Sequence, residues 1–377
     1  MEPRCQLGHV HVFQAYVMRL KPDHGSSRGS ALDRGENRRP IVTLVCSASL
    51  AGVVFLTSSA AVEPDNDAWI ALGARLFSDR RLSADGSVSC ATCHKPEAAY
   101  ADGLSVAVGI GGHAGTRNAP SLMGVGALSV FNWDGRTHTL EEQVLQPFTT
   151  SIEHGLASRD ELTQRVTEDP AYRRSFSDLA AVGTREIRSM DIATALAAFV
   201  RSLSAESSAF DRYRAGHDPD ALTDSAKRGL EVFQGHAGCA SCHTVGEAAA
   251  ATFTDQRFHA LGVGLSSVGT RLESILARIE GSPRSIGADD ILSDPDIADL
   301  GRYLVTRLPE DIGRFRTPSL RNVARTAPYF HDGSVATLET AVDLELYYRR
   351  QSDGALTAVS RDEREDLLAF LRALSGL

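Results

Sequence analysis

The chain has 377 residues, of which 42% are hydrophobic and 23% are charged. This composition is typical of a folded globular protein and excludes a disordered chain, a collagen-like fibre and a multi-span membrane protein. The formal net charge of −9 argues against a nucleic-acid partner, because such binding needs a positively charged surface. The length is sufficient for two domains of ordinary size.

The first 61 residues have the pattern of a secretory leader. Arg34, Arg38 and Arg39 precede an uncharged apolar run at 41–56, and small residues follow it at 58–61. Positive flank, apolar stretch and small-residue end are typical of a signal peptide. The run is shorter than the roughly 20 residues of a transmembrane helix, so anchoring by this segment is the less favoured alternative. We therefore expect residues 1–61 to direct export to the periplasm.

Beyond the leader, the pattern is mainly helical. Apolar residues recur at helical spacing in four stretches, 69–77, 185–203, 224–234 and 271–280. A fifth helix is expected to start after Ser360, because Ser360 and Glu363 have the spacing of a capping box. No segment shows sustained strand alternation, and the helical pattern breaks near 205–222. These features predict a mainly α fold with a domain boundary in that break.

Two copies of the pattern Cys-x-x-Cys-His carry the chemistry. They are Cys90, Cys93 and His94 in the first half, and Cys239, Cys242 and His243 in the second. Two thiols three positions apart on a turn can add to the two vinyl groups of one porphyrin, and the histidine is then placed to bind its iron. A four-cysteine zinc ribbon needs closer pairs, and a redox dithiol does not need the histidine twice. We therefore expect two covalent c-type haems.

The methionines limit what these haems can be. Met1 and Met18 lie in the leader, and no methionine follows Met190. A haem with histidine and methionine ligands in the second half would therefore have to borrow Met123 or Met190 from the first. This arrangement is unfavourable, which argues against a simple two-haem electron carrier with His/Met ligands.

Residues from about 69 to 377 resemble the bacterial di-haem cytochrome c peroxidases and their MauG relatives, which are di-haem enzymes of methylamine utilisation. The resemblance rests on motifs in the same order at 82–90, 115–122, 133–136, 140–143, 314–323 and 326–333. About thirty residues near 264–294 look like an insertion relative to that pattern. The resemblance implies two cytochrome c-like domains, at 62–215 with the peroxide-site haem and at 216–377 with the electron-transfer haem.

The resemblance also assigns catalytic roles. Trp133 matches the tryptophan that the family places between the two haems, Glu153 the carboxylate at the peroxide site, and Gln143 the glutamine beside it. The implied mechanism binds peroxide over the haem held by His94 and moves a proton through Glu153. Electrons come through Trp133 from the haem held by His243.

One further site implied by the resemblance is a calcium ion between the domains. Asn118 and the main-chain carbonyls of Thr326 and Pro328 match its position. Carbonyl and amide oxygens are suitable ligands for Ca²⁺.

The sequence departs from the peroxidase pattern in two places. Ile110 stands where peroxidases carry a loop histidine that caps the first haem, and His113 is three residues away. The far ligand of the second haem falls at Glu345, with Tyr347 and Tyr348 close behind, where peroxidases have methionine and MauG has tyrosine. We expect the first haem to be open, and Glu345 or Tyr348 to be the candidate far ligand of the second.

The expected function is a periplasmic di-haem peroxidase. It reduces hydrogen peroxide to water with electrons from a small redox protein, either a cytochrome c or a cupredoxin. The alternative is a MauG-like oxidase that modifies a residue of a partner protein, and the second alternative is a non-enzymatic electron carrier. The resemblance also allows a homodimer.

Overall fold

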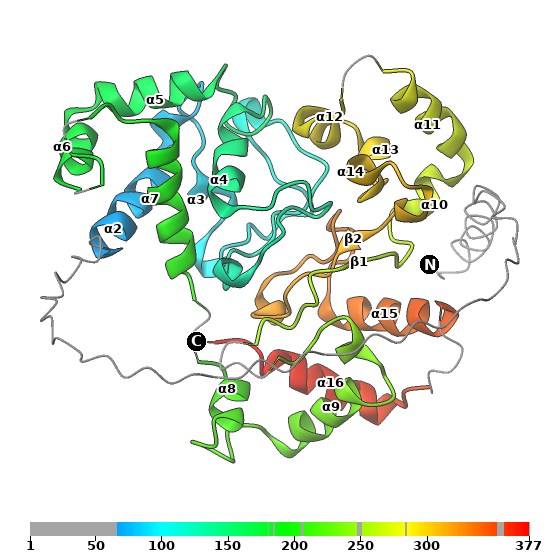
Figure 1. Ribbon diagram of the computed structural model, residues 1–377. Coiled ribbons are helices and arrows are strands. Elements are labelled where there is room, and N and C mark those ends of the chain that lie inside the picture. The colour runs from blue at the N-terminus through cyan, green and yellow to red at the C-terminus, as the bar shows by residue number, and fades with distance from the viewer. Residues whose placement is uncertain are drawn as a thin grey trace, which may run out of the picture.

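The protein is described here by a computed structural model that covers residues 66–376, except 180, 184, 205, 206, 247–250, 283, 284 and 353–357. The predicted leader, residues 1–61, lies outside the described residues. Fifteen α-helices and two short strands are described, joined by long loops and 3₁₀ turns (Figure 1). None of the described helices combines the length and the apolar character that crossing a membrane requires.

The helices, in chain order, are α2 (Asn66–Ser78), α3 (Cys90–Cys93), α4 (Leu140–Thr149), α5 (Arg159–Glu168), α6 (Pro170–Asp178), α7 (Ser189–Ser202), α8 (Ala209–Arg214), α9 (Asp224–Gln234), α10 (Leu265–Val268), α11 (Leu272–Glu280), α12 (Ala288–Ser293), α13 (Pro295–Ala298), α14 (Tyr303–Thr306), α15 (Leu338–Ser352) and α16 (Arg361–Arg372). Strands β1 (Phe258–His259) and β2 (Phe315–Arg316) pair antiparallel, with Phe258 opposite Arg316.

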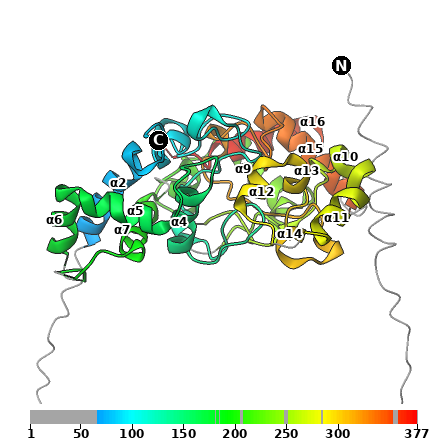
Figure 2. The same ribbon diagram turned by 90° about the horizontal axis from the view of Figure 1, so that it is seen from above.

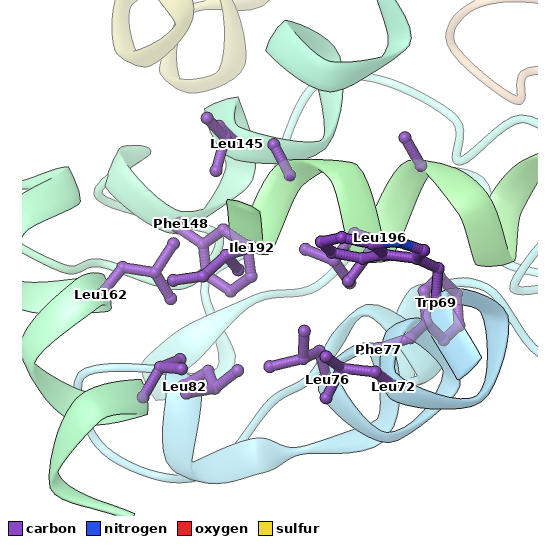
Figure 3. Close-up of a cluster of buried hydrophobic side chains, with 14 of the residues drawn as sticks. Trp69, Leu72, Leu76, Phe77, Leu82, Leu145, Phe148, Leu162, Ile192 and Leu196 are labelled. Carbon is purple, nitrogen blue, oxygen red and sulfur yellow. The ribbon is translucent and has the colours of Figure 1, made fainter. Parts of the chain in front are cut away.

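The first hydrophobic core lies between α2, α4, α5 and α7. Trp69, Leu76 and Phe77 of α2 pack with Ile192 and Leu196 of α7 (Figure 3). The two helices cross at Gly73, where an added Cβ would lie 1.9 Å from the carbonyl oxygen of Ala195. Only a glycine permits this approach, which sets α2 directly against α7 just before the first Cys-x-x-Cys-His motif.

The second core repeats this arrangement. Helix α9 crosses α16 at Gly229, where an added Cβ would lie 1.9 Å from the carbonyl oxygen of Asp366. Phe233 stands four residues after Gly229, as Phe77 stands four residues after Gly73, and both phenylalanines are buried. Each motif thus follows a helix with the same glycine crossing and the same aromatic anchor, which is an internal structural repeat.

A third cluster forms a lobe from α10 to α14 and the turn that follows. Its core contains Leu265, Val268, Leu272, Ile275, Ile279, Ile291, Ile297, Leu300 and Ile312. The lobe lies at the opposite end of the molecule from α2 and α6 in both views (Figures 1 and 2). It contains the described residues of the segment 264–294, which the sequence marks as an insertion.

The helices predicted from apolar spacing are confirmed. They correspond to α2, α7, α9 and α11, although α7 begins at Ser189, later than the predicted 185. The predicted capping box is present, because Ser360 Oγ accepts the Glu363 N–H at 3.2 Å and Glu363 accepts the Ser360 N–H at 2.8 Å. The mainly α fold class is confirmed, whereas the division at 215/216 stays a prediction.

Candidate functional site

Both Cys-x-x-Cys-His motifs open on one cavity of about 450 Å³. The first motif lies on the single turn α3, and the second lies on a 3₁₀ turn at Cys239–Ser241. All six motif residues line the cavity, and the four cysteines are free thiols. The structure therefore brings together two pairs of thiols and two histidines that are far apart in the sequence.

Each motif histidine is held in the same way. His94 Nδ1 lies 2.9 Å from the carbonyl oxygen of Tyr100, and His243 Nδ1 lies 3.0 Å from that of Phe253. Both Tyr100 and Phe253 have positive φ (58° and 51°). A carbonyl at Nδ1 fixes the tautomer with a proton there and leaves Nε2 as the nitrogen for a metal.

Burial lowers the pKa of both histidines, to about 4 for His243. The imidazoles therefore stay neutral, as an iron ligand must be. Paired thiols, an oriented neutral histidine and an apolar cavity fit a covalently attached haem in each half. The carbonyl acceptors Tyr100 and Phe253 were not found from the sequence, because they follow their histidines at different spacings, six and ten residues.

Trp133 lines the same cavity and is held from both halves of the chain. Its indole Nε1 donates to the carbonyl oxygen of Asn118 at 3.0 Å. Its own carbonyl oxygen accepts the Arg316 N–H at 2.8 Å, which ties it to strand β2. Trp133 therefore lines the cavity that both motifs share, and its place between two haems stays a prediction.

Glu153 faces the cavity from the loop after α4. Burial raises the pKa of its carboxyl group above the ordinary value, while the Thr150 hydroxyl and the Arg136 charge act in the opposite direction. Gly109 packs against the backbone of this loop, where an added Cβ would lie 1.7 Å from the carbonyl oxygen of Ile152. A carboxyl group with a raised pKa in an enclosed site can both accept and return a proton.

Gln143 lies on α4 in the same cavity wall and forms a double hydrogen bond with Asn132. Asn132 Nδ2 donates to Gln143 Oε1 at 2.6 Å, and Gln143 Nε2 donates to Asn132 Oδ1 at 3.1 Å. Asn132 also donates to the Thr137 hydroxyl at 2.9 Å. Sequence reasoning missed Asn132 and Arg136 as cavity residues, although both flank the predicted Trp133.

On the side of the second motif, α15 presents Glu345 to the cavity. Burial raises the pKa of this carboxyl group to about 7, against the opposing effect of Arg349. Arg349 donates to the Gly238 carbonyl oxygen at 2.6 Å and so ties α15 to the motif turn. Tyr348 is outside the cavity lining and packs edge-on against Tyr347 at 5.4 Å between ring centroids. Of the two predicted far ligands, only Glu345 therefore lines the cavity.

The residues near the first motif include no second histidine from the 110–113 loop. Ile110 packs against Gly155, and His113 is exposed and outside the cavity lining. Met123 lines the cavity, whereas Met190 is 47% exposed on α7.

The predicted calcium ligands Asn118, Thr326 and Pro328 all line the cavity. Asn118 donates through Nδ2 to the Leu104 carbonyl oxygen at 2.9 Å, so its Oδ1 can act as a ligand. The calcium site itself stays a prediction.

Among the described residues, one cluster has the spacing of a metal site, with ligand atoms of Cys242, Asp255 and His259 within 4.8 Å of one another. His259 Nε2 lies 2.8 Å from Asp255 Oδ2. A thioether bond at Cys242 would consume the thiolate of this cluster, so it competes with haem attachment.

Comparison with known proteins identifies a matching family and relatives that align over about four fifths of the chain. Residues 67–219 match the family "di-haem cytochrome c peroxidase". The chain is 36% identical to the methylamine utilization protein MauG of Methylorubrum extorquens over 313 residues, covering 81% of this chain and 78% of MauG. It is 34% identical to the cytochrome c peroxidase Ccp of Escherichia coli over 312 residues, covering 82% of this chain and 58% of that longer protein.

Solved structures show the same relationship. A MauG-like protein associated with microbial copper homeostasis superposes with a TM-score of 0.64 at 31% identity, covering 82% of this chain and 89% of that one. The di-haem peroxidase BthA of Burkholderia thailandensis gives a TM-score of 0.62 at 25% identity, covering 83% and 86%.

Proposed function

The chain belongs to the di-haem cytochrome c peroxidase and MauG family, and on this premise we propose that it is a peroxidase with two covalent c-type haems. It converts one hydrogen peroxide, two electrons and two protons into two waters. The observation that carries the proposal is the shared cavity. The oriented histidines His94 and His243 line it, together with the buried carboxyl group of Glu153.

Each cofactor has its own attachment set. Cys90, Cys93 and His94, which line the cavity, would hold the haem of the first half, and the corresponding residues of the second motif, Cys239, Cys242 and His243, would hold the other. Once attached, each haem would supply an iron that exchanges single electrons, and the one in the first half would supply the site of peroxide binding.

The protein residues then handle the proton and the path of the electrons. Glu153, as a carboxylate, takes the proton from one peroxide oxygen and gives it to the other as the O–O bond breaks, so that the doubly protonated oxygen leaves as water. The remaining oxygen takes up the two electrons and two further protons and becomes the second water. Gln143, locked by Asn132, offers a fixed amide to orient the peroxide. Trp133 lies in the cavity wall that both motifs share and provides the aromatic contact between the two redox sites.

The remaining parts of the proposal concern surroundings rather than chemistry. The electron donor is a small redox protein, a cytochrome c or a cupredoxin, and the protein acts in the periplasm after export. A calcium ion held by Asn118, Thr326 and Pro328 would fix the two halves relative to each other.

A MauG-like oxidase is the second candidate. Two observations favour it, namely that Ile110 replaces the capping histidine with His113 exposed, and that Glu345 rather than a methionine lines the second site. In that case, the two electrons that return the enzyme to its resting state would come from a residue of a protein partner, which is oxidised, instead of from a small redox protein.

Peroxide titration of the purified two-haem protein separates these candidates. For the peroxidase, reduced donor is oxidised continuously while peroxide lasts, and the optical spectrum returns to its resting form. A long-lived oxidised state that a reduced cytochrome does not discharge would instead support the MauG-like oxidase. Two inert six-coordinate irons would support the electron carrier.

A further inference from the structure

The lobe formed by α10–α14 reaches the loop that carries Glu153. Asp289 on α12 accepts the Ser151 N–H at 2.7 Å and the Ser151 hydroxyl at 2.8 Å, both through Oδ1. Ser151 is two residues before Glu153 in the same turn. A side chain from a distant part of the chain therefore fixes the backbone next to the proposed proton-transfer group.

Two further contacts join α12 to this wall of the cavity. The Thr116 hydroxyl donates to the Ile291 carbonyl oxygen at 2.7 Å, and Leu292 itself lines the cavity. The Glu153 turn is held on its other side by Ile110, whose N–H donates to the Glu153 carbonyl oxygen at 3.1 Å. The turn is thus clamped between the 109–110 backbone and α12.

We propose that Asp289 is a positioning residue for peroxide cleavage, and that the lobe at 264–312 serves to hold the Glu153 turn in its working geometry. This inference rests on the proposed function. Its physical reason is that proton transfer needs the carboxylate within hydrogen-bond reach of peroxide, so a small displacement of the turn costs rate.

The negative charge of Asp289 can be tested separately, through the pH dependence of the reaction. The charge of Arg136 favours the carboxylate form of Glu153, and the charge of Asp289 disfavours it. The histidines His94 and His154 line the same cavity, and burial lowers the pKa of both and so favours their neutral forms. Cys90 and Cys93 become neutral thioethers when haem is attached. Removing the negative charge of Asp289 should therefore lower the pKa of Glu153 and move the acid side of the activity profile to lower pH.

The test compares Asp289→Ala, Asp289→Asn and Asp290→Asn in the two-haem protein. Asp289→Ala removes both the acceptor and the charge, and we expect about a tenfold fall in kcat/KM for peroxide. Asp289→Asn keeps an acceptor oxygen for Ser151, so most of the rate should remain. In both variants the acid limb should move to lower pH, and the shift should shrink with added salt.

Asp290→Asn is the matched control, because it removes the same negative charge from the neighbouring residue. The Asp290 carboxylate accepts the N–H of Gly287 at the start of its own helix instead of contacting Ser151. It should keep the wild-type rate. If Asp289→Ala keeps the wild-type kcat/KM and the low-pH fall in its activity profile stays at the wild-type pH, the inference is wrong. A lower kcat/KM with the low-pH fall at the wild-type pH would also overturn it. If Asp289→Ala loses haem or fails to fold, the pH profile of Asp289→Asn is the test. A low-pH fall in activity that moves to lower pH supports the inference, and one that stays in place contradicts it.

Failure of this inference can be told from failure of the proposed function. Wild-type turnover with unaffected Asp289 variants removes the role of Asp289 alone. A wild-type protein that holds both haems but does not turn over peroxide removes the proposed function, and this role with it.

Discussion

At the scale of single residues, the chemistry depends on a carboxyl group that is enclosed without a strong ion pair. Glu153 is in contact with the Thr150 hydroxyl and near Arg136, but burial outweighs both and raises its pKa. A raised pKa makes a carboxylate a better proton acceptor than an ordinary glutamate, which suits a group that accepts a proton and returns it.

Glu153→Gln should leave both haems attached and lower kcat/KM for peroxide by about 100-fold or more, because an amide cannot carry the proton. Stopped-flow mixing with peroxide measures the rate. Glu142→Gln is the matched control, since Glu142 lies on α4 and pairs with Arg159 at 2.5 Å outside the cavity. Equal rates for both variants would remove Glu153 from the mechanism.

The pH profile follows from the direction of the Glu153 shift. The reaction begins with the carboxylate form, and a raised pKa means that this form is lost at a higher pH than for an ordinary glutamate. The rate should therefore fall as pH decreases through the raised pKa, and this limb should be missing in Glu153→Gln. A limb that persists in the variant would assign the titration to another group.

At the second motif, Glu345 lines the cavity and Tyr348 does not, so only Glu345 is placed to bind the second haem iron. Glu345→Met should change the optical and electron-paramagnetic-resonance spectra of one haem and raise its reduction potential, because methionine ligation favours the reduced iron. Tyr348→Phe should leave both unchanged, since Tyr348 does not line the cavity. The reverse pattern would make Tyr348 the ligand.

At the scale of elements, the two glycine crossings carry the internal repeat. Gly73→Ala and Gly229→Ala each place a Cβ 1.9 Å from a backbone oxygen, so the helices must separate. We expect each to lower the free energy of unfolding by about 1–3 kcal/mol or more. Gly269→Ala is the control, because Gly269 has helical backbone angles and nothing lies within 4 Å of its added Cβ.

Denaturant unfolding, followed by circular dichroism, measures these changes. If Gly269→Ala lowers the free energy of unfolding as much as Gly73→Ala and Gly229→Ala do, the close helix crossing is not the cause of the lost stability. Unchanged stability in Gly73→Ala would mean that α2 and α7 pack less closely than their backbone positions require.

Elements with a regular apolar stripe or a side-chain cap were predictable. Helix α9 is the clearest case, because it has the predicted range 224–234, with Thr223 as its cap and Gly235 at its end. Helix α4 was not predicted, because Pro147 lies within it and a proline normally interrupts a helix. Its start carries favourable signals, since Thr139 caps it and Glu141 and Glu142 lie in its first turn. The contact of α12 with Ser151 could not be predicted, because no local pattern encodes pairing between segments 138 residues apart.

At the scale of the whole molecule, the sequence indicated two haem sites but not that they share one cavity. The two halves meet through Trp133 and strand β2, where Arg316 donates to the Trp133 carbonyl oxygen at 2.8 Å. Which candidate far ligand reaches the cavity also depends on the placement of α15 as a whole. Sequence spacing left Glu345 and Tyr348 open, and the packing of the helix distinguishes them.

The central claim is that peroxide is reduced to water in this cavity with electrons supplied from outside. The most direct measurement counts reduced one-electron donor consumed per hydrogen peroxide, using the purified protein with both haems attached. We predict two donor molecules oxidised for each peroxide, continuing over many turnovers. Peroxide consumption without donor oxidation, or no consumption by the intact two-haem protein, would contradict the account.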